Sequence, residues 1–467
     1  MKRRDFFRNG SLAALGTSLL NPIDTNAAPP TKKKPQTPKN IIFMVSDGMS
    51  TGTLDMADLL LLRQFNRSSH WLQLYRDNRV RRSLMDMASA NSLITDSAAA
   101  SSSWGGGVRV NNGALNVSPD GTPNKPILQK FKEARKSVGC VTTVQITHAT
   151  PAGFCVNSKS RGSMEDIALQ YLDLRFDVMM GGGTEVFSKD KRKDKRDVFQ
   201  DFKTAGYQVA TNRTEMMGVQ AGSPVLGVFN EGGLPYALDR AQDETLKTNV
   251  PTLAEMTETA IKQMQGNPNG FVLQVESGKV DWAAHANDIG GLLYEQIQFD
   301  DAIKVAIDFA EKDKNTLVVI TTDHGNASPA LLYGTNANKN FDHIATAFKQ
   351  TNEWVLNKID KNFSVTQIIE LFEAKQGIVI KPEDALSILS NYYALGEGGV
   401  YNARKLPFQR LGQLQTPFTS VGWAGTEHTA EYVELAMFGP GSEQLNSFIK
   451  NTDLHQFLLA VTDVKGA

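Results

Sequence analysis

Six apolar runs rich in β-branched residues recur along this chain, at 40–47, 137–145, 176–183, 271–277, 315–325 and 431–441. Segments with helical periodicity lie between them, at 123–136, 252–265 and 292–313. Strands that are apolar on both faces and that alternate with helices are typical of a parallel sheet covered by helices on each side. We therefore predict an α/β fold, with a central, mostly parallel sheet between helix layers. No internal repeat is found.

The length of 467 residues accommodates one large α/β domain with an insertion, or two or three domains. A hydrophobic content of 41% and a charged content of 21% are typical of soluble globular proteins. The net charge of −1 gives no electrostatic basis for specific nucleic-acid binding. The run at 189–197 alternates Lys and Arg with Asp, which indicates a solvated loop.

The first residues resemble an export signal. Arg3 and Arg4 precede two aromatic residues and a weakly apolar stretch, and small residues follow near position 28. This pattern is typical of a twin-arginine signal, and the stretch is too short and polar for a stable membrane span. We expect a signal over 1–28, a Pro/Lys-rich tether over 29–39, and a periplasmic or secreted mature protein.

The pattern changes at residue 326. The block 326–425 is mostly polar, with two predicted helices at 364–374 and 381–393 and a Gly-rich loop at 396–399. We interpret it as a crown-like insertion on the rim of the sheet, acting as a lid or an interface. It separates the two parts, 40–325 and 426–467, of the predicted catalytic α/β domain.

Two cysteines, Cys140 and Cys155, are compatible with one disulfide or with two free thiols.

Acidic and imidazole side chains stand where predicted strands end. Asp47 ends the first run, Glu276 ends the fourth, and Asp323 and His324 end the fifth. Open α/β sheets bind ligands beyond the carboxyl ends of their strands. A single acidic residue there is often a helix cap or a turn former. Three such strand ends together favour a binding site.

A further cluster suits a metal ion. Asp281 and His285 are four residues apart, so on a helical turn they share one face. Oxygen and nitrogen ligands suit Zn²⁺, although a surface ion pair has the same spacing. His428 precedes the last predicted strand. The remaining histidines are His148, in a polar loop-like segment, and His70, His343 and His455, in contexts that we interpret as structural.

The segment "TDSAAASSSWGGG", at 95–107, is unusually rich in small residues. A helix of Ala and Ser can approach its neighbours closely, and its N-terminus presents backbone N–H groups to an anion or a nucleophile. Asp96 and Ser97 could also be an ordinary helix cap.

Seven motifs occur in the order and spacing of the alkaline phosphatases, and the chain resembles that family from about residue 40 to 440, outside 326–425. The motifs are "SDGMS", "TDSAAA", "THATPAGF", "SKSRG", "QVESGKVDWAAH", "TTDHG" and "EHTAEY". The resemblance implies a phosphomonoesterase that acts on small phosphate monoesters, and it implies a homodimer.

The resemblance also implies roles for individual residues. Ser97 would be the nucleophile, forming a phosphoserine that water then hydrolyses, and Arg161 would bind the phosphate oxygens through its bidentate fork. Two Zn²⁺ ions and a third metal ion would be bound. The implied ligands are Asp281, His285 and His428 for one zinc, Asp47, Asp323 and His324 for the other, and Asp47, Glu276 and Thr150 for a third site that usually holds Mg²⁺.

Two positions depart from the family pattern. His148 stands where some members have Asp, and imidazole near the third site would suit Zn²⁺ better than Mg²⁺. Trp282 stands where some members have Lys, and it either stacks near the phosphate entrance or packs on its helix.

Other classes of protein fit the sequence less well. A sulfatase needs Cys or Ser followed by x-Pro-x-Arg, which Ser97 lacks. A phosphodiesterase should lack the third site and Arg161, and a non-catalytic exported binding protein should lack the nucleophile or a metal set.

Overall fold

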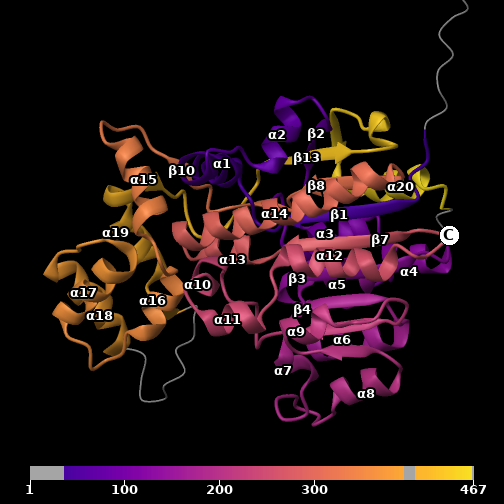
Figure 1. Ribbon diagram of the computed structural model, residues 1–467, viewed down its shortest axis with the longest axis horizontal. Coiled ribbons are helices and arrows are strands. Elements are labelled where there is room, and N and C mark those ends of the chain that lie inside the picture. The colour runs from indigo at the N-terminus through magenta and orange to yellow at the C-terminus, as the bar shows by residue number, and fades with distance from the viewer. Residues whose placement is uncertain (1–35, 394–404, 465–467) are drawn as a thin grey trace, which may run out of the picture. The chain divides into compact units, whose positions relative to one another are not determined.

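The computed structural model describes residues 36–393 and 405–464, and a ten-stranded sheet lies at its centre (Figure 1). In spatial order the strands are β14 (Phe448–Lys450), β2 (Arg81–Asp86), β13 (Val433–Phe438), β8 (Thr316–Thr321), β1 (Asn40–Ser46), β7 (Phe271–Ser277), β3 (Ser137–Gln145), β4 (Val178–Gly182), β6 (Val225–Val228) and β5 (Gln208–Ala210). Strand β13 runs antiparallel to both of its neighbours, and the other pairs are parallel. The predicted fold class is confirmed.

All six predicted runs contain a strand of this sheet, and β3 and β7 have the predicted bounds. The four strands that the sequence did not predict are β2, β5, β6 and β14. Strand β2 begins with exposed Arg81 and Arg82, and β5 and β14 have three residues each. Short strands near the edges of a sheet bury little apolar surface, so their sequences lack the continuous apolar run of a central strand.

Helices cover both faces of the sheet. Alternate side chains of β1 point to opposite faces: Ile42 and Met44 belong to one apolar core, and Ile41, Phe43 and Val45 belong to the other. The first core is closed by α1 (Thr51–Phe65), α12 (Leu253–Met264) and α14 (Ile289–Asp313), and the second by α3 (Ser97–Gly105), α4 (Ile127–Glu133), α5 (Ala149–Cys155), α6 (Met164–Leu174) and α20 (Asn451–Val461).

Small residues bring α3 and α5 into close contact. A Cβ atom added to Gly153 would lie 2.4 Å from Oγ of Ser101, so only glycine fits there. The hydroxyl of Ser101 donates a 2.6 Å hydrogen bond to the carbonyl oxygen of Thr150. Close approach thus explains the Ala/Ser composition of 95–107, and Asp96 caps the helix by accepting from the Ala99 N–H at 2.9 Å.

Five helices of the 326–425 block gather at the left of Figure 1. They are α15 (Ala337–Ala347), α16 (Asn352–Lys358), α17 (Val365–Gln376), α18 (Pro382–Tyr393) and α19 (Phe408–Thr419). The predicted helices correspond to α17 and α18. The Asn352 N–H donates to Oδ2 of Asp288 at 2.6 Å, which connects the start of α16 to the N-cap of α14.

The other helices are short: α2 (His70–Arg76), α7 (Thr184–Phe187), α8 (Val198–Thr204), α9 (Arg213–Met217), α10 (Ala237–Arg240), α11 (Glu244–Asn249) and α13 (Lys279–His285). Two small antiparallel sheets pair β10 (Ala330–Leu331) with β11 (Val421–Gly422), and β9 (Gly325–Asn326) with β12 (His428–Thr429). The predicted signal at 1–28, part of the tether and the Gly-rich loop at 396–399 lie outside the described residues. None of the described helices is long and apolar enough to cross a membrane. Cys140 and Cys155 are buried free thiols whose Sγ atoms are 3.7 Å apart.

Candidate active site

The candidate site lies at the carboxyl ends of three adjacent strands. Strand β1 is hydrogen-bonded to β7 on one side and to β8 on the other, so Asp47, Glu276 and Asp323 meet at one edge of the sheet. Helix α13 adds Asp281 and His285 from one face, as their spacing predicted. His428 lies in β12, which pairs with β9 directly after His324.

The structure brings the predicted ligands into three groups. The groups are Asp281, His285 and His428; Asp47, Asp323 and His324; and Asp47, His148 and Glu276. Within each group, one ligand atom from every residue lies within 4.8 Å of the others. Thr150, the other residue expected at the third site, has its hydroxyl 3.3 Å from Oδ2 of Asp47. His148 thus lies inside the third group.

Hydrogen bonds orient three of these imidazoles. The Nδ1 atoms of His285, His428 and His324 lie 2.6, 2.9 and 3.3 Å from backbone carbonyl oxygens, to which a protonated Nδ1 donates. In that tautomer each Nε2 presents a lone pair to the site. The Nε2 atoms of His285 and His428 are only 3.2 Å apart, so two lone pairs face each other. A cation between them would turn this repulsion into shared coordination.

Buried carboxylate oxygens without partners give an independent test of whether a cation fits. Oδ1 of Asp47, Oδ2 of Asp323 and Oε1 of Glu276 are buried and have no hydrogen-bond partner among the described residues, and the same holds for Nδ1 of His148. Uncompensated buried polar atoms are costly and rare in native proteins. Oxygen and imidazole donors in this arrangement fit divalent metal ions.

Burial sets the protonation of these groups in the absence of a cation. It raises the pKa of Asp323 to about 8 and that of Glu276 to about 7, because charge is unfavourable in an apolar interior. Burial, together with the nearby charge of Arg161, lowers the pKa of His148 to about 3. His148 is therefore neutral, whereas Asp323 and Glu276 need a cation to remain fully ionised near pH 7.

Ser97 and Arg161 lie beside the metal groups. Ser97 is the first residue of α3, is buried, and has its hydroxyl 3.4 Å from Nε2 of His324. The Arg161 guanidinium donates to Oδ2 of Asp96 at 3.0 Å, and its Nη2 lies 3.1 Å from Nε2 of His148. Trp282 is half-buried, with its ring 6.2 Å from that of His148 and 4.9 Å from Nζ of Lys279. Trp282 therefore packs against its neighbours, as one of the two interpretations expected, and it also lies beside His148 of the third group.

Two supporting residues were missed in the sequence. Thr142 on β3 lies opposite Glu276 in the sheet register and donates its hydroxyl to Oε2 of that carboxylate. Asn326 donates from its amide to Oδ1 of Asp281 at 2.7 Å. Asn326 follows the Asp-His pair closely and could have been suspected, whereas the partner of Thr142 depends on strand register.

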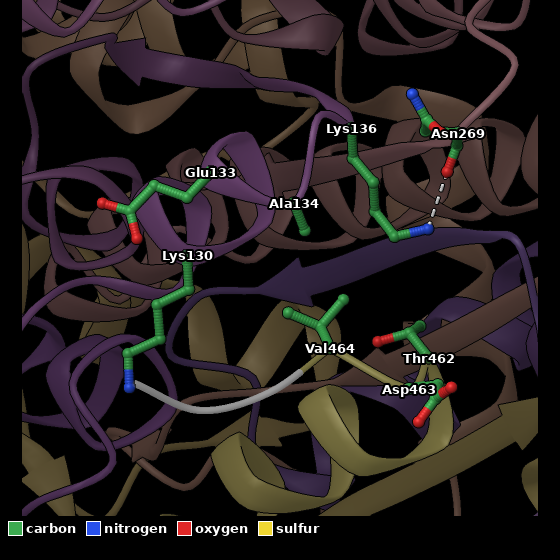
Figure 2. Close-up of a pocket in the computed structure, with 8 residues that line it drawn as sticks. All are labelled: Lys130, Glu133, Ala134, Lys136, Asn269, Thr462, Asp463 and Val464. Atoms are coloured by element: carbon green, nitrogen blue, oxygen red, sulfur yellow. Dashed lines mark hydrogen bonds between the residues drawn. The ribbon is translucent and has the colours of Figure 1, made fainter.

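A cavity lies away from the metal groups (Figure 2). Its volume is about 420 Å³, and its lining includes Lys130, Lys136 and Asn269. The Lys136 ammonium donates to the carbonyl oxygens of Lys39 and Asn269, at 2.7 and 2.8 Å. These residues precede β1, β3 and β7, so the cavity lies at the opposite ends of the strands that hold the metal groups.

Known proteins share this architecture. The family model described as alkaline phosphatase matches residues 38–464. Alkaline phosphatase 4 of Bacillus subtilis (strain 168) is 33% identical over 433 residues, covering 89% of this chain and 87% of the relative. Alkaline phosphatase 3 of the same strain is 35% identical over 368 residues, covering 77% and 75%. The crystal structure of Thermus thermophilus alkaline phosphatase has a TM-score of 0.85 at 29% identity, covering 96% of each chain.

Proposed function

The chain belongs to the alkaline phosphatase family of metal-dependent phosphomonoesterases, and from this premise we propose that it hydrolyses its esters through a phosphoserine at Ser97. The observation that carries the proposal is the position of Ser97. Its hydroxyl stands at the start of α3, 3.4 Å from an imidazole of one candidate metal group. A helix N-terminus also favours negative charge, on an attacking oxygen or on a bound phosphate.

The reaction consists of two displacements. In the first, Oγ of Ser97 forms a bond to phosphorus while the bond to the ester oxygen breaks, and the alcohol leaves with a proton. In the second, water forms the new bond to phosphorus, the Ser97 oxygen leaves, and inorganic phosphate is released. Ser97 regains its proton, so the chain is unchanged after each cycle.

Arg161 binds the phosphate oxygens in this proposal. Its planar guanidinium can donate two parallel hydrogen bonds to one phosphate. Asp96 and His148 contact two of its nitrogens and restrict its orientation, so little entropy is lost when substrate binds. The same hydrogen bonds stabilise the charge on the equatorial oxygens during both displacements.

We propose two Zn²⁺ ions in the groups of Asp281, His285 and His428 and of Asp47, Asp323 and His324, and a third metal ion held by Asp47, Glu276 and Thr150. When bound, such ions would supply positive charge that lowers the pKa of a hydroxyl or water and that neutralises the oxygens of an in-line displacement. The third ion is Mg²⁺ if only oxygens bind it. The neighbouring imidazole of His148 makes Zn²⁺ the alternative.

The deciding experiment combines metal analysis with trapping of the intermediate. We expect the purified protein to hold about two zinc ions per chain and to hydrolyse p-nitrophenyl phosphate much faster than a diester or a sulfate ester. Acid quenching during turnover should leave phosphate on the peptide that contains Ser97, detected by mass spectrometry. A phosphate-free peptide under saturating substrate, or a diester rate equal to the monoester rate, contradicts the proposal.

Three further features belong to the proposal. We infer that 326–425 is a rim insertion into a catalytic domain formed by 40–325 and 426–467, that residues 1–28 direct twin-arginine export to the periplasm or medium, and that the protein is a homodimer. Light scattering of the purified protein tests the dimer. N-terminal sequencing of the exported protein tests the signal, because cleavage near residue 28 is expected.

A further inference from the structure

The carboxylate of Glu431 accepts hydrogen bonds from three hydroxyl groups. Its Oε1 accepts hydrogen bonds from Ser50 at 2.9 Å, from Ser328 at 2.6 Å and from Thr429 at 2.7 Å. Within the part of the chain that the structure describes, no Lys, Arg or His forms an ion pair with it. This carboxylate is therefore bound by hydroxyls of its own chain, and it is not among the candidate ligands.

Each hydroxyl belongs to a segment that holds a proposed metal ligand. The first lies three residues after Asp47, the second lies four residues after His324, and the third directly follows His428. These segments are far apart in the sequence and come from both zinc groups. One oxygen of Glu431 thus connects the three chain segments that must stay in register for the two groups to keep their geometry.

The pairing of β1 with β8 holds the first two segments side by side, whereas the third segment is joined to them by little local secondary structure. Strands β9 and β12 have two residues each, with His428 opposite Asn326 and Thr429 opposite Gly325. Directly after β9, Ala327 and Ser328 have φ values of 54° and 36°. A left-handed backbone costs about 1 kcal/mol or more for such residues and persists only where contacts enforce it. The bond from Ser328 to Glu431 is one such contact.

The same network extends to the fourth ligand segment. Oγ of Ser50 accepts from the Asn326 N–H at 3.1 Å, and the Asn326 amide donates to Oδ1 of Asp281 at 2.7 Å. A displacement of Ser50 would therefore also disturb Asn326 and, through it, Asp281 on α13. Groups that support metal ligands from outside the coordination sphere typically change metal affinity 10- to 100-fold when they are removed.

We propose that Glu431 is a positioning residue, which fixes the segments of Asp47, His324 and His428 relative to one another and so sets the affinity and geometry of the two-metal centre. This inference rests on the proposed function. It concerns the placement of the ligands, because Glu431 is not a member of any candidate metal group.

The test compares Glu431→Ala and Glu431→Gln with a matched control, Glu215→Ala. Glu215 lies on α9, and its Oε2 accepts from the hydroxyl of Thr211 at 2.9 Å. Helix α9 contacts β5, an edge strand that β7, β3, β4 and β6 separate from β1. Two readouts are used: the affinity for zinc in competition with a chelator, and the visible absorption spectrum of the cobalt-substituted protein, which reports ligand geometry. Neither readout requires turnover.

We expect Glu431→Ala to lower zinc affinity roughly 10- to 100-fold and to alter the cobalt spectrum. Glu431→Gln retains an acceptor oxygen, so it should restore much of the zinc affinity and of the cobalt spectrum. Glu215→Ala should have the zinc affinity and the cobalt spectrum of the parent. Parental affinity and spectrum in Glu431→Ala overturn the inference. If that variant does not fold, Ser328→Ala and Thr429→Val each remove one hydroxyl, and parental affinity in both overturns it equally. A parent that binds no stoichiometric metal overturns the proposed function as well, which separates the two failures.

Discussion

Arg161 donates a 3.0 Å hydrogen bond to Oδ2 of Asp96, while Oδ1 of the same carboxylate caps the helix that begins at Ser97. One side chain therefore orients both the proposed nucleophile and the proposed phosphate ligand. The Gly113 N–H also donates to Oδ2 of Asp96, at 3.0 Å. The sequence showed Asp96 only as a possible cap.

We expect Asp96→Ala to lower the free energy of unfolding by about 1 kcal/mol through loss of the cap. It should also weaken inhibition by inorganic phosphate roughly tenfold, because a hydrogen bond between charged groups contributes about 1.5 kcal/mol. Asp96→Asn separates the effects, since its amide oxygen can still cap the helix. Parental phosphate inhibition in Asp96→Asn would mean that the ion pair does not orient Arg161.

Ser97→Ala should reduce turnover of phosphate monoesters by several orders of magnitude, because no covalent intermediate can form. Binding of inorganic phosphate should change only a few-fold, since Arg161 and the metal groups remain. The measurements are steady-state kinetics and calorimetric titration with phosphate. Retained turnover would contradict the covalent role.

Removal of metal by a chelator should abolish activity and lower the midpoint of thermal unfolding, and added zinc should restore both. Without cations, Oδ1 of Asp47 and Oδ2 of Asp323 are buried with no hydrogen-bond partner among the described residues. Calorimetry of the chelated and reconstituted protein tests this expectation. An unchanged rate in excess chelator counts against the metal-dependent mechanism.

His148→Asp should raise the preference of the third site for Mg²⁺ over Zn²⁺, because a carboxylate replaces an imidazole beside Asp47 and Glu276. We expect added Mg²⁺ to activate the variant more than the parent. Metal analysis after dialysis against both ions gives the direct measurement. Equal magnesium content in the two proteins would show that His148 does not select the ion.

Glu295 gives a pH-dependent prediction away from the metal groups. It is buried on α14, and burial raises its pKa to about 7. The folded state therefore holds this proton more tightly than the unfolded chain. The resulting stabilisation is complete below the unfolded pKa, near 4.3, and is lost as the pH rises through 7.

Glu295→Gln removes this titration and retains an oxygen for the Ala237 N–H, which donates to the parent at 2.7 Å. Relative to the parent, the variant should gain stability between pH 5 and pH 8, by up to about 1.4 kcal/mol for each unit between the folded and unfolded pKa. Urea unfolding at several pH values and fixed zinc concentration measures the difference. A difference independent of pH would exclude Glu295 as the source.

The central strands were predictable because they are buried on both faces: every residue of β1 is buried, and Ile41 to Val45 form a continuous apolar run two residues before Asp47. Strand β2 was not predicted, because Arg81 and Arg82 are exposed near the edge of the sheet. Helices α15, α16 and α19 were not predicted, because polar residues separate the apolar residues in their sequences.

At the site, spacing alone indicated that Asp281 and His285 share a face, since four residues are about one helical turn. The strand ends indicated a binding site at Asp47, Glu276, Asp323 and His324, and the resemblance then assigned the metal ligands. Contacts that depend on tertiary packing, such as Thr142 with Glu276, have no local signal, because the register of β3 on β7 decides which side chains meet.

The position of β1 at the centre of the sheet determines the order in which the protein can assemble. Ile41 pairs with Val272 on one side and with Leu317 on the other, so the first strand has no sheet partner until most of the chain has been synthesised. Such distant pairings make folding slow and leave apolar segments exposed to aggregation or chaperones in the meantime. Binding of the proposed metal ion by Asp47 together with Asp323 would therefore follow chain collapse and would occur only in the assembled sheet.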